Sequence, residues 1–177
     1  MLCSLETGQD LCHDFMVRLI SVKMEKDDDS QMIIGHSSFI KTIEDLYETM
    51  FSSVPGIKFG IAFSEASGPC LVRSEGNDNR LRKIAIKNIL KIKAGHSFII
   101  IFKNAYPINV TNGIKNIGEV TRIFCSTGNP VEVIIAKTKT GNSILGVVDG
   151  FSPKGVEDSA EVKKRRDFIR EIGYKVK

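Results

Sequence analysis

An uninterrupted apolar run, FIIIF at residues 98–102, constrains the fold more than any other part of the sequence. The run leaves no polar side for water, so it predicts a β-strand buried on both faces at the centre of a sheet. His96 stands just before this strand, Lys103 and Asn104 follow it, and Pro107 is placed to open a helix. Polar groups at the end of a central strand often bind a ligand, and a helix N-terminus favours an anion, so phosphate is the first ligand to expect.

The remaining patterns predict an α+β fold. Alternating or short apolar runs predict seven strands, at 17–24, 57–63, 70–74, 97–102, 120–126, 131–138 and 144–148. Helical spacing of apolar residues predicts four helices, near 39–50, 81–92, 107–116 and 159–172. The acidic run at 27–29 breaks the first strand, and we expect a loop from there to residue 38. Strands and helices are intermixed and include two hairpins, which favours mixed sheets packed together with outer helices over a doubly wound parallel sheet.

Length and charge indicate one domain that does not bind nucleic acid. A chain of 177 residues supports one well-formed core, and we place a single domain at 16–177 after a poorly patterned extension at 1–15. The net charge of +4 is spread along the sequence. The basic run at 163–166 is flanked by acidic residues and carries apolar helical spacing, so it is better explained as a solvated helix face than as a nucleic-acid site.

The cysteines and the apolar runs predict a cytoplasmic protein. The four cysteines show no CxxC spacing, which favours reduced thiols in a reducing compartment. Cys12 and His13 are adjacent, but two further ligands at a recognisable spacing are lacking, so no metal site is predicted there. No apolar run approaches the ~20 residues that a membrane span needs, and the first residues lack the pattern of an export signal.

Long segments of the chain resemble the adenosine-specific kinase family of archaea and bacteria, formerly a domain of unknown function. The resemblance covers residue 16 to the C-terminus and rests on FIKTIEDLYETM, SVPGIKFGIAFSEASGPCLVR, AGHSFIIIFKNAYPIN, RIFCSTGNPVEVI, GVVDGFSPKGVE and REIGYK. It implies a four-layer α/β/β/α domain, assembly as a homotrimer, and phosphorylation of adenosine to AMP with a histidine as phosphate carrier. The family pattern leads us to expect a histidine just before FIKT, where this chain has Ser38, with His36 two positions earlier.

Three residues are candidates for catalysis. His96 could accept a phosphoryl group, because a neutral imidazole is nucleophilic near pH 7, and His36 is the alternative histidine. Glu65 could assist a hydroxyl nucleophile or hold Mg²⁺, and Lys103 could offset phosphate charge. Each has a plain structural alternative: a histidine bonded to a nearby carbonyl, an acid in a turn, and a solvated lysine at a strand end.

A second set of residues is nominated for nucleotide binding. These residues lie in small-residue loops or polar turns that follow apolar segments: Ser67, Gly68, Asn104, Tyr106, Asn109, Asn129 and Asp149. Asparagines could hydrogen-bond the base or ribose, Tyr106 could stack on the base, and Asp149 could hold Mg²⁺. Asn109 beside Pro107 also fits ordinary turn and capping chemistry. The sequence has no GxxxxGK[ST] motif, so a Walker A loop is excluded.

Three functions follow from these observations. The first is a kinase that converts adenosine and a phosphate donor, taken as ATP with Mg²⁺, to AMP, with His96, Glu65, Lys103 and Asn104 around the phosphate. The second is a module that binds AMP or a related nucleotide without turnover. The third is a structural trimer whose polar turn caps a helix and binds no nucleotide.

Overall fold

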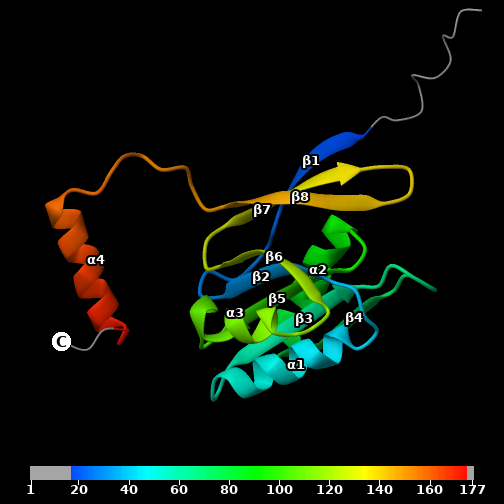
Figure 1. Ribbon diagram of the computed structural model, residues 1–177, viewed down its shortest axis with the longest axis horizontal. Helices are drawn as coiled ribbons and strands as arrows, with labels where there is room; N and C mark the ends of the chain where they lie inside the picture. The colour runs from blue at the N-terminus through cyan, green and yellow to red at the C-terminus, as the bar shows by residue number, and fades with distance from the viewer. Residues whose placement is uncertain (1–16, 175–177) are drawn as a thin grey trace, which may run out of the picture.

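The computed structural model describes residues 17–174, which form two sheets and four helices (Figure 1). In chain order the elements are β1 (Arg18–Lys23), β2 (Gln31–Ser37), α1 (Thr42–Ser53), β3 (Lys58–Ser64), β4 (Val72–Gly76), α2 (Asn79–Ile92), β5 (Ser97–Lys103), α3 (Pro107–Lys115), β6 (Val120–Thr127), β7 (Val131–Lys137), β8 (Asn142–Asp149) and α4 (Ser159–Glu171). The extension expected at 1–15 lies outside the described residues. No helix within 17–174 is long and apolar enough to cross a membrane.

The larger sheet has five strands in the order β4-β3-β5-β2-β6, and all neighbours are antiparallel. β5 is the central strand, and Ile100 at its middle pairs with Ile61 of β3 and Ile33 of β2. All five residues of the FIIIF run are fully buried. The prediction of a central strand buried on both faces is confirmed.

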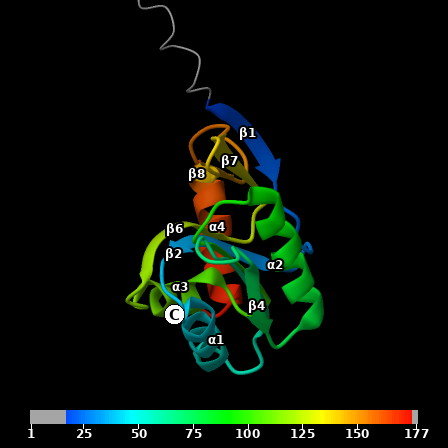
Figure 2. The same cartoon turned by 90° about the vertical axis from the view of Figure 1, so that its right-hand side faces the viewer.

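The two faces of this sheet are covered differently, which gives the α+β architecture. One face packs against α1 and α3, with Phe59, Phe98 and Phe102 in the core between them. The other face packs against α2 and a smaller antiparallel sheet of order β1-β7-β8. Figure 2 shows α1 and α2 on either side of β4. The predicted α+β class with two packed sheets is confirmed.

The prediction of a loop before residue 38 is wrong, because residues 31–37 form β2. This strand pairs with β5 on one side and β6 on the other, and Met32, Ile33 and Ile34 are fully buried. Its apolar core is only three residues long, too short to establish a strand period, and tertiary pairing decides its structure. Gly35 lets Phe98 approach, because a Cβ there would lie 2.2 Å from the Phe98 ring.

Most of the predicted helix boundaries are confirmed. The Asp78 side chain caps α2 by accepting from the Arg80 and Leu81 amides, Asp158 caps α4, and Pro107 is the first residue of α3. The helix predicted near 39–50 is shifted along the chain, because α1 begins at Thr42 and ends at Ser53. Figure 1 shows α4 apart from both sheets, and none of its residues is buried.

Candidate functional site

His96 sits at the entrance of β5 in a left-handed backbone conformation, with φ of +57°. Its amide donates to the Ser64 carbonyl at 2.7 Å, and its carbonyl accepts from the Ser37 amide at 2.9 Å. These bonds to β3 and β2 hold a conformation that costs a non-glycine residue free energy. The ring stacks on Phe63 with centroids 6.2 Å apart, and 34% of the side chain stays exposed.

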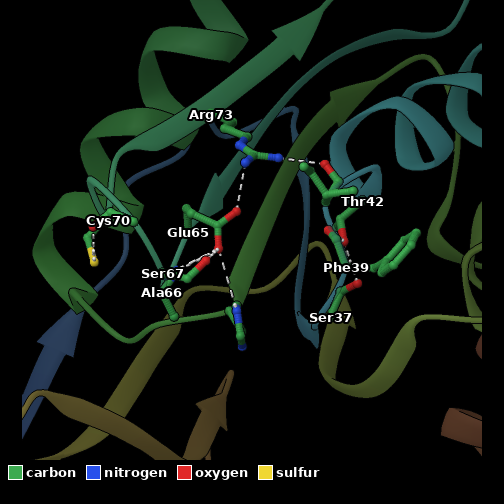
Figure 3. Close-up of polar contacts among 11 residues, drawn as sticks. Ser37, Phe39, Thr42, Glu65, Ala66, Ser67, Cys70 and Arg73 are labelled. Carbon is green, nitrogen blue, oxygen red and sulfur yellow. Dashed lines mark hydrogen bonds and ion pairs between the residues drawn. The ribbon is translucent and has the colours of Figure 1, made fainter.

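Glu65 faces the His96 ring from the loop between β3 and β4 (Figure 3). Its Oε1 lies 3.7 Å from His96 Nε2 and accepts bonds from the Ser67 hydroxyl at 3.0 Å and the Ala66 and Ser67 amides. Its Oε2 pairs with Arg73 at 2.8 Å. The Ser67 hydroxyl, followed by the two amides and Arg73, lowers the pKa of Glu65 against the opposing effect of burial. A carboxylate only 12% exposed is therefore kept ionised beside an imidazole.

Arg73 joins this pair to the segment between β2 and α1. Its guanidinium donates to the Ile40 carbonyl at 2.5 Å while it pairs with Glu65 (Figure 3). The same segment is fixed at its base, because the Ser37 and Thr42 hydroxyls bond at 2.8 Å and the Thr42 hydroxyl donates to the Phe39 carbonyl. Three separate parts of the chain thus meet around the carboxylate.

His36 lies on the other side of His96, with ring centroids 5.9 Å apart in an edge-to-face contact. It lines a cavity of about 360 Å³ between the larger sheet and β8, together with Arg122 and Ser143. Burial, followed by the charges of His96 and Arg122, lowers the pKa of His36. Both histidines named from the sequence are therefore neighbours, and His36 lines the cavity.

Lys103 is at the opposite end of β5 and does not reach His96 within one chain. Seven residues of strand span roughly 20 Å. The Lys103 ammonium pairs with Asp29 at 2.7 Å and Asp27 at 2.9 Å, which raises its own pKa and lowers those of both carboxyls. The structure thus places Lys103 in an ion-pair cluster of its own.

The polar residues after β5 are engaged in local structure. The Asn104 side chain donates to the Gly56 carbonyl at 3.2 Å. The Asn109 side chain accepts from the Tyr106 amide at 2.8 Å at the start of α3 and donates to the Tyr174 hydroxyl at 3.0 Å. The capping alternative considered for Asn109 is what the structure contains.

The other nominated residues divide between the two ends of β5. Asn129 donates to Asp149 at 3.0 Å, and both lie at the end of the sheets where Lys103 is found, since Thr127 of β6 pairs with Met32 of β2. Ser67 shares the Glu65 loop with Gly68, which has φ of +55° and open space around it. Only Ser67 and Gly68 of the nucleotide-binding set therefore accompany His96 and Glu65.

Comparison with known proteins agrees with this architecture. The family model described as adenosine specific kinase matches residues 22–175. The chain belongs to the adenosine-specific kinase family. It is also similar to the crystal structure of the PH1918 protein from Pyrococcus horikoshii OT3, with 46% identity and a TM-score of 0.88 over 92% of this chain and 100% of that one. No curated protein matches the chain.

Two arginines at the site of this adenosine-specific kinase family member were not predicted from the sequence. Arg73 lies in β4 opposite Phe63, and Arg122 lies in β6 opposite His36. Each is one charged residue in a strand, with nothing nearby in the sequence to mark it. Only the strand pairing, which joins residues far apart in the chain, brings them to the two histidines.

The described residues do not fit a magnesium ion held by the protein alone. Within 17–174 no group of three or more His, Cys, Asp or Glu side chains is placed to hold a metal. The two carboxylates nominated for Mg²⁺ are already engaged, Glu65 by Arg73 and Ser67, and Asp149 by Asn129. Mg²⁺ commonly enters phosphoryl-transfer sites bound to substrate phosphates.

Proposed function

We propose that this protein is a kinase that transfers a phosphoryl group to adenosine to form AMP, with His96 as the phosphate carrier. The observation that supports this best is the pairing of a partly exposed imidazole with an ionised carboxylate, His96 with Glu65, beside a cavity. A carboxylate that orients an imidazole is the usual way to activate it as a nucleophile. Membership of a family described as adenosine specific kinase supports the same substrate.

The proposed first step forms a bond between a ring nitrogen of His96 and the terminal phosphorus of a nucleotide donor. The bond from that phosphorus to the bridging oxygen breaks, and the electron pair leaves with the nucleoside diphosphate. Glu65 Oε1, 3.7 Å from Nε2, favours a hydrogen on that nitrogen and leaves the Nδ1 lone pair to attack. We propose ATP as the donor, with Mg²⁺ as part of the ATP substrate.

The contacts of Arg73 assign it a positioning role in this proposal. It fixes Glu65 from the side away from the ring and ties the loop to Ile40. Because Arg73 is already paired with Glu65, its proposed role is to hold the carboxylate that faces His96.

The decisive experiment follows both half-reactions in purified protein. With labelled ATP and Mg²⁺ we expect an acid-labile, base-stable phosphoenzyme, and on addition of adenosine we expect labelled AMP. His96→Ala should form neither, while its melting temperature stays close to that of the wild type. Saturable binding of AMP with no consumption of ATP would select the nucleotide-binding module instead, and no thermal shift with either ligand would select the structural trimer.

We propose a cytoplasmic location on the basis of the thiols. Cys70 is a free, exposed thiol and Cys125 is a free, buried one, whose pKa burial raises to about 12. An exposed free thiol persists most readily in a reducing compartment. Fractionation of the source cells would test this location.

We also propose assembly as a homotrimer through α4. This helix buries no residue within one chain, yet it places Val162, Phe168 and Ile169 on one side, and Phe168 is 56% exposed. An amphipathic helix that stands apart from its own core is typical of an element that packs on a second copy. We expect a mass in solution of about three times the 19.6 kDa chain. Phe168→Asp should dissociate the assembly, and Lys163→Asp on the opposite side of α4 should not.

A further inference from the structure

The Thr121 hydroxyl contacts two atoms of His36. Its oxygen lies 2.8 Å from Nδ1 and 3.2 Å from the His36 carbonyl oxygen. When the hydroxyl donates its single hydrogen to the carbonyl, the same oxygen accepts from Nδ1, which then carries the ring hydrogen. In this tautomer Nε2 keeps its lone pair and is a proton acceptor.

The surroundings of His36 keep the ring neutral. Burial is the largest cause of its lowered pKa, and the charges of His96 and Arg122, the charged groups that face it, act in the same direction. Arg122 is itself held in place, with its guanidinium 5.7 Å from the centre of the Phe124 ring. A neutral imidazole with a free Nε2 is ready to accept a proton near pH 7.

The cavity beside His36 has the size and lining of a small-molecule site. Its volume of about 360 Å³ lies within the range of roughly 300–1,000 Å³ found for ligand pockets. Phe124 and Ile144 supply apolar surface, and Arg122 and Ser143 supply polar groups. Gly95 and Ser97, the chain neighbours of His96, also line it, so the cavity opens next to the proposed phosphate carrier.

We infer that this cavity receives the acceptor nucleoside and that His36 is the catalytic base for the second half-reaction. The inference rests on the proposed function. The bond between phosphorus and His96 Nδ1 breaks, and its electron pair returns to the imidazole. A bond forms between phosphorus and the 5′-oxygen of adenosine, and the hydroxyl proton moves to His36 Nε2. The two adjacent histidines thus have different duties, with His96 carrying phosphate and His36 accepting the proton.

The test separates phosphoenzyme formation from transfer. His36→Ala should form the phosphoenzyme from ATP within about threefold of the wild-type rate, but transfer to adenosine should slow by about 100-fold or more. The wild-type transfer rate should rise with pH as His36 loses its proton, and this rise should be absent from the variant. Added imidazole should restore part of the lost rate, which it would not do for a purely structural defect.

A second variant tests the tautomer without removing the ring. Thr121→Val should weaken the preference for hydrogen on Nδ1, as read from long-range ¹H–¹⁵N spectra of the His36 ring, and slow the transfer by about 10-fold. Transfer in His36→Ala within threefold of wild type, or an equal loss in both half-reactions, overturns this inference alone. A wild-type protein that makes no AMP overturns the proposed function and the inference with it.

Discussion

Each end of β5 carries a basic side chain beside a carboxylate, but the two ends differ in whether these groups can still interact with a ligand. At the Lys103 end the ammonium lies between Asp27 and Asp29, and each charge already has a partner. At the His96 end the Glu65 carboxylate faces an imidazole that stays 34% exposed, and the chain neighbours of His96 line a cavity. A group that is already neutralised by its neighbours adds to structure, whereas an oriented group with free capacity can act on a ligand.

Backbone conformation does not distinguish the two ends. His96 has φ of +57° and Asn104 has φ of +63°, so a left-handed residue flanks the strand on each side. The Asn104 side chain bonds the Gly56 carbonyl, which is the local role expected of asparagine in such turns. The imidazole of His96 instead faces other side chains from β2 and the Glu65 loop. Partners, rather than strain, mark the candidate site.

The largest expected effect is the difference in rate between two variants, one at each end of β5. His96→Ala should lower the rate of AMP formation by about 10³-fold or more, because it removes the proposed nucleophile. Lys103→Met should leave the rate per folded molecule within about threefold and lower the melting temperature, because Asp29 loses its ion-pair partner and Asp27 keeps only Arg80. Steady-state rates and thermal melts of both variants provide the measurement. Comparable rate losses in the two variants would break the comparison.

Substitutions at two glycines should likewise distinguish an effect on stability from an effect on activity. Gly60 pairs with Ile101 towards the Lys103 end, and a Cβ there would lie 2.1 Å from the Arg82 backbone nitrogen. Gly60→Ala should therefore lower the free energy of unfolding by about 1–3 kcal/mol. A Cβ on Gly95 would lie 2.7 Å from the Ala66 Cβ, so Gly95→Ala should displace the Glu65 loop and mainly slow turnover, by about 10-fold.

Gly118→Ala is the matched control for both glycine variants, because a Cβ there meets no atom within 4 Å. Denaturant unfolding and steady-state rates should both stay near wild-type values in this variant. Loss of activity without loss of stability in Gly60→Ala would contradict the assignment of roles.

A smaller effect is expected from Arg73→Met, which keeps the length of the side chain but removes its charge. Glu65 would lose its partner at 2.8 Å and the Ile40 carbonyl its donor. We expect AMP formation to fall by about 10-fold through misplacement of the carboxylate. Arg73→Lys should recover only part of the rate, since lysine cannot contact both partners with one planar group. An unchanged rate in Arg73→Met would remove this residue from the site.

The smallest effect is the response of stability to pH. The pKa of His36 lies below its ordinary 6.5, so the unfolded chain takes up the proton first and stability falls as the pH drops below that value. The pKa of Asp27 lies below 3.8, chiefly because of Lys103, so its contribution persists until the pH falls through that lowered value. Thermal melts between about pH 7.5 and about pH 5.5 should show a decline that His36→Gln reduces and Lys103→Met retains.

Much of the scaffold could be predicted because it depends on local patterns. The apolar run before Lys103 identified the central strand, Pro107 marked the start of α3, and the small residues after Glu65 indicated a loop. β2 was missed because its three buried residues are too few to reveal a period. Its position between β5 and β6 depends on pairing that only the folded chain contains.

The site was harder to predict because sequence proximity and spatial proximity differ. His96 and Lys103 are seven positions apart, yet the extended strand places them at opposite ends of the sheet. Arg73 and His36 are far from His96 in the sequence, yet antiparallel pairing places both at the same end of the sheet as His96. The residue types at the site were recognisable, but their grouping required the register of the sheet.

The left-handed backbone at His96 has a consequence for stability. A side chain with a Cβ costs about 1–3 kcal/mol in such a conformation, whereas glycine adopts it freely. An enzyme variant with glycine at this position would accordingly be inactive and yet withstand heating longer than the native chain.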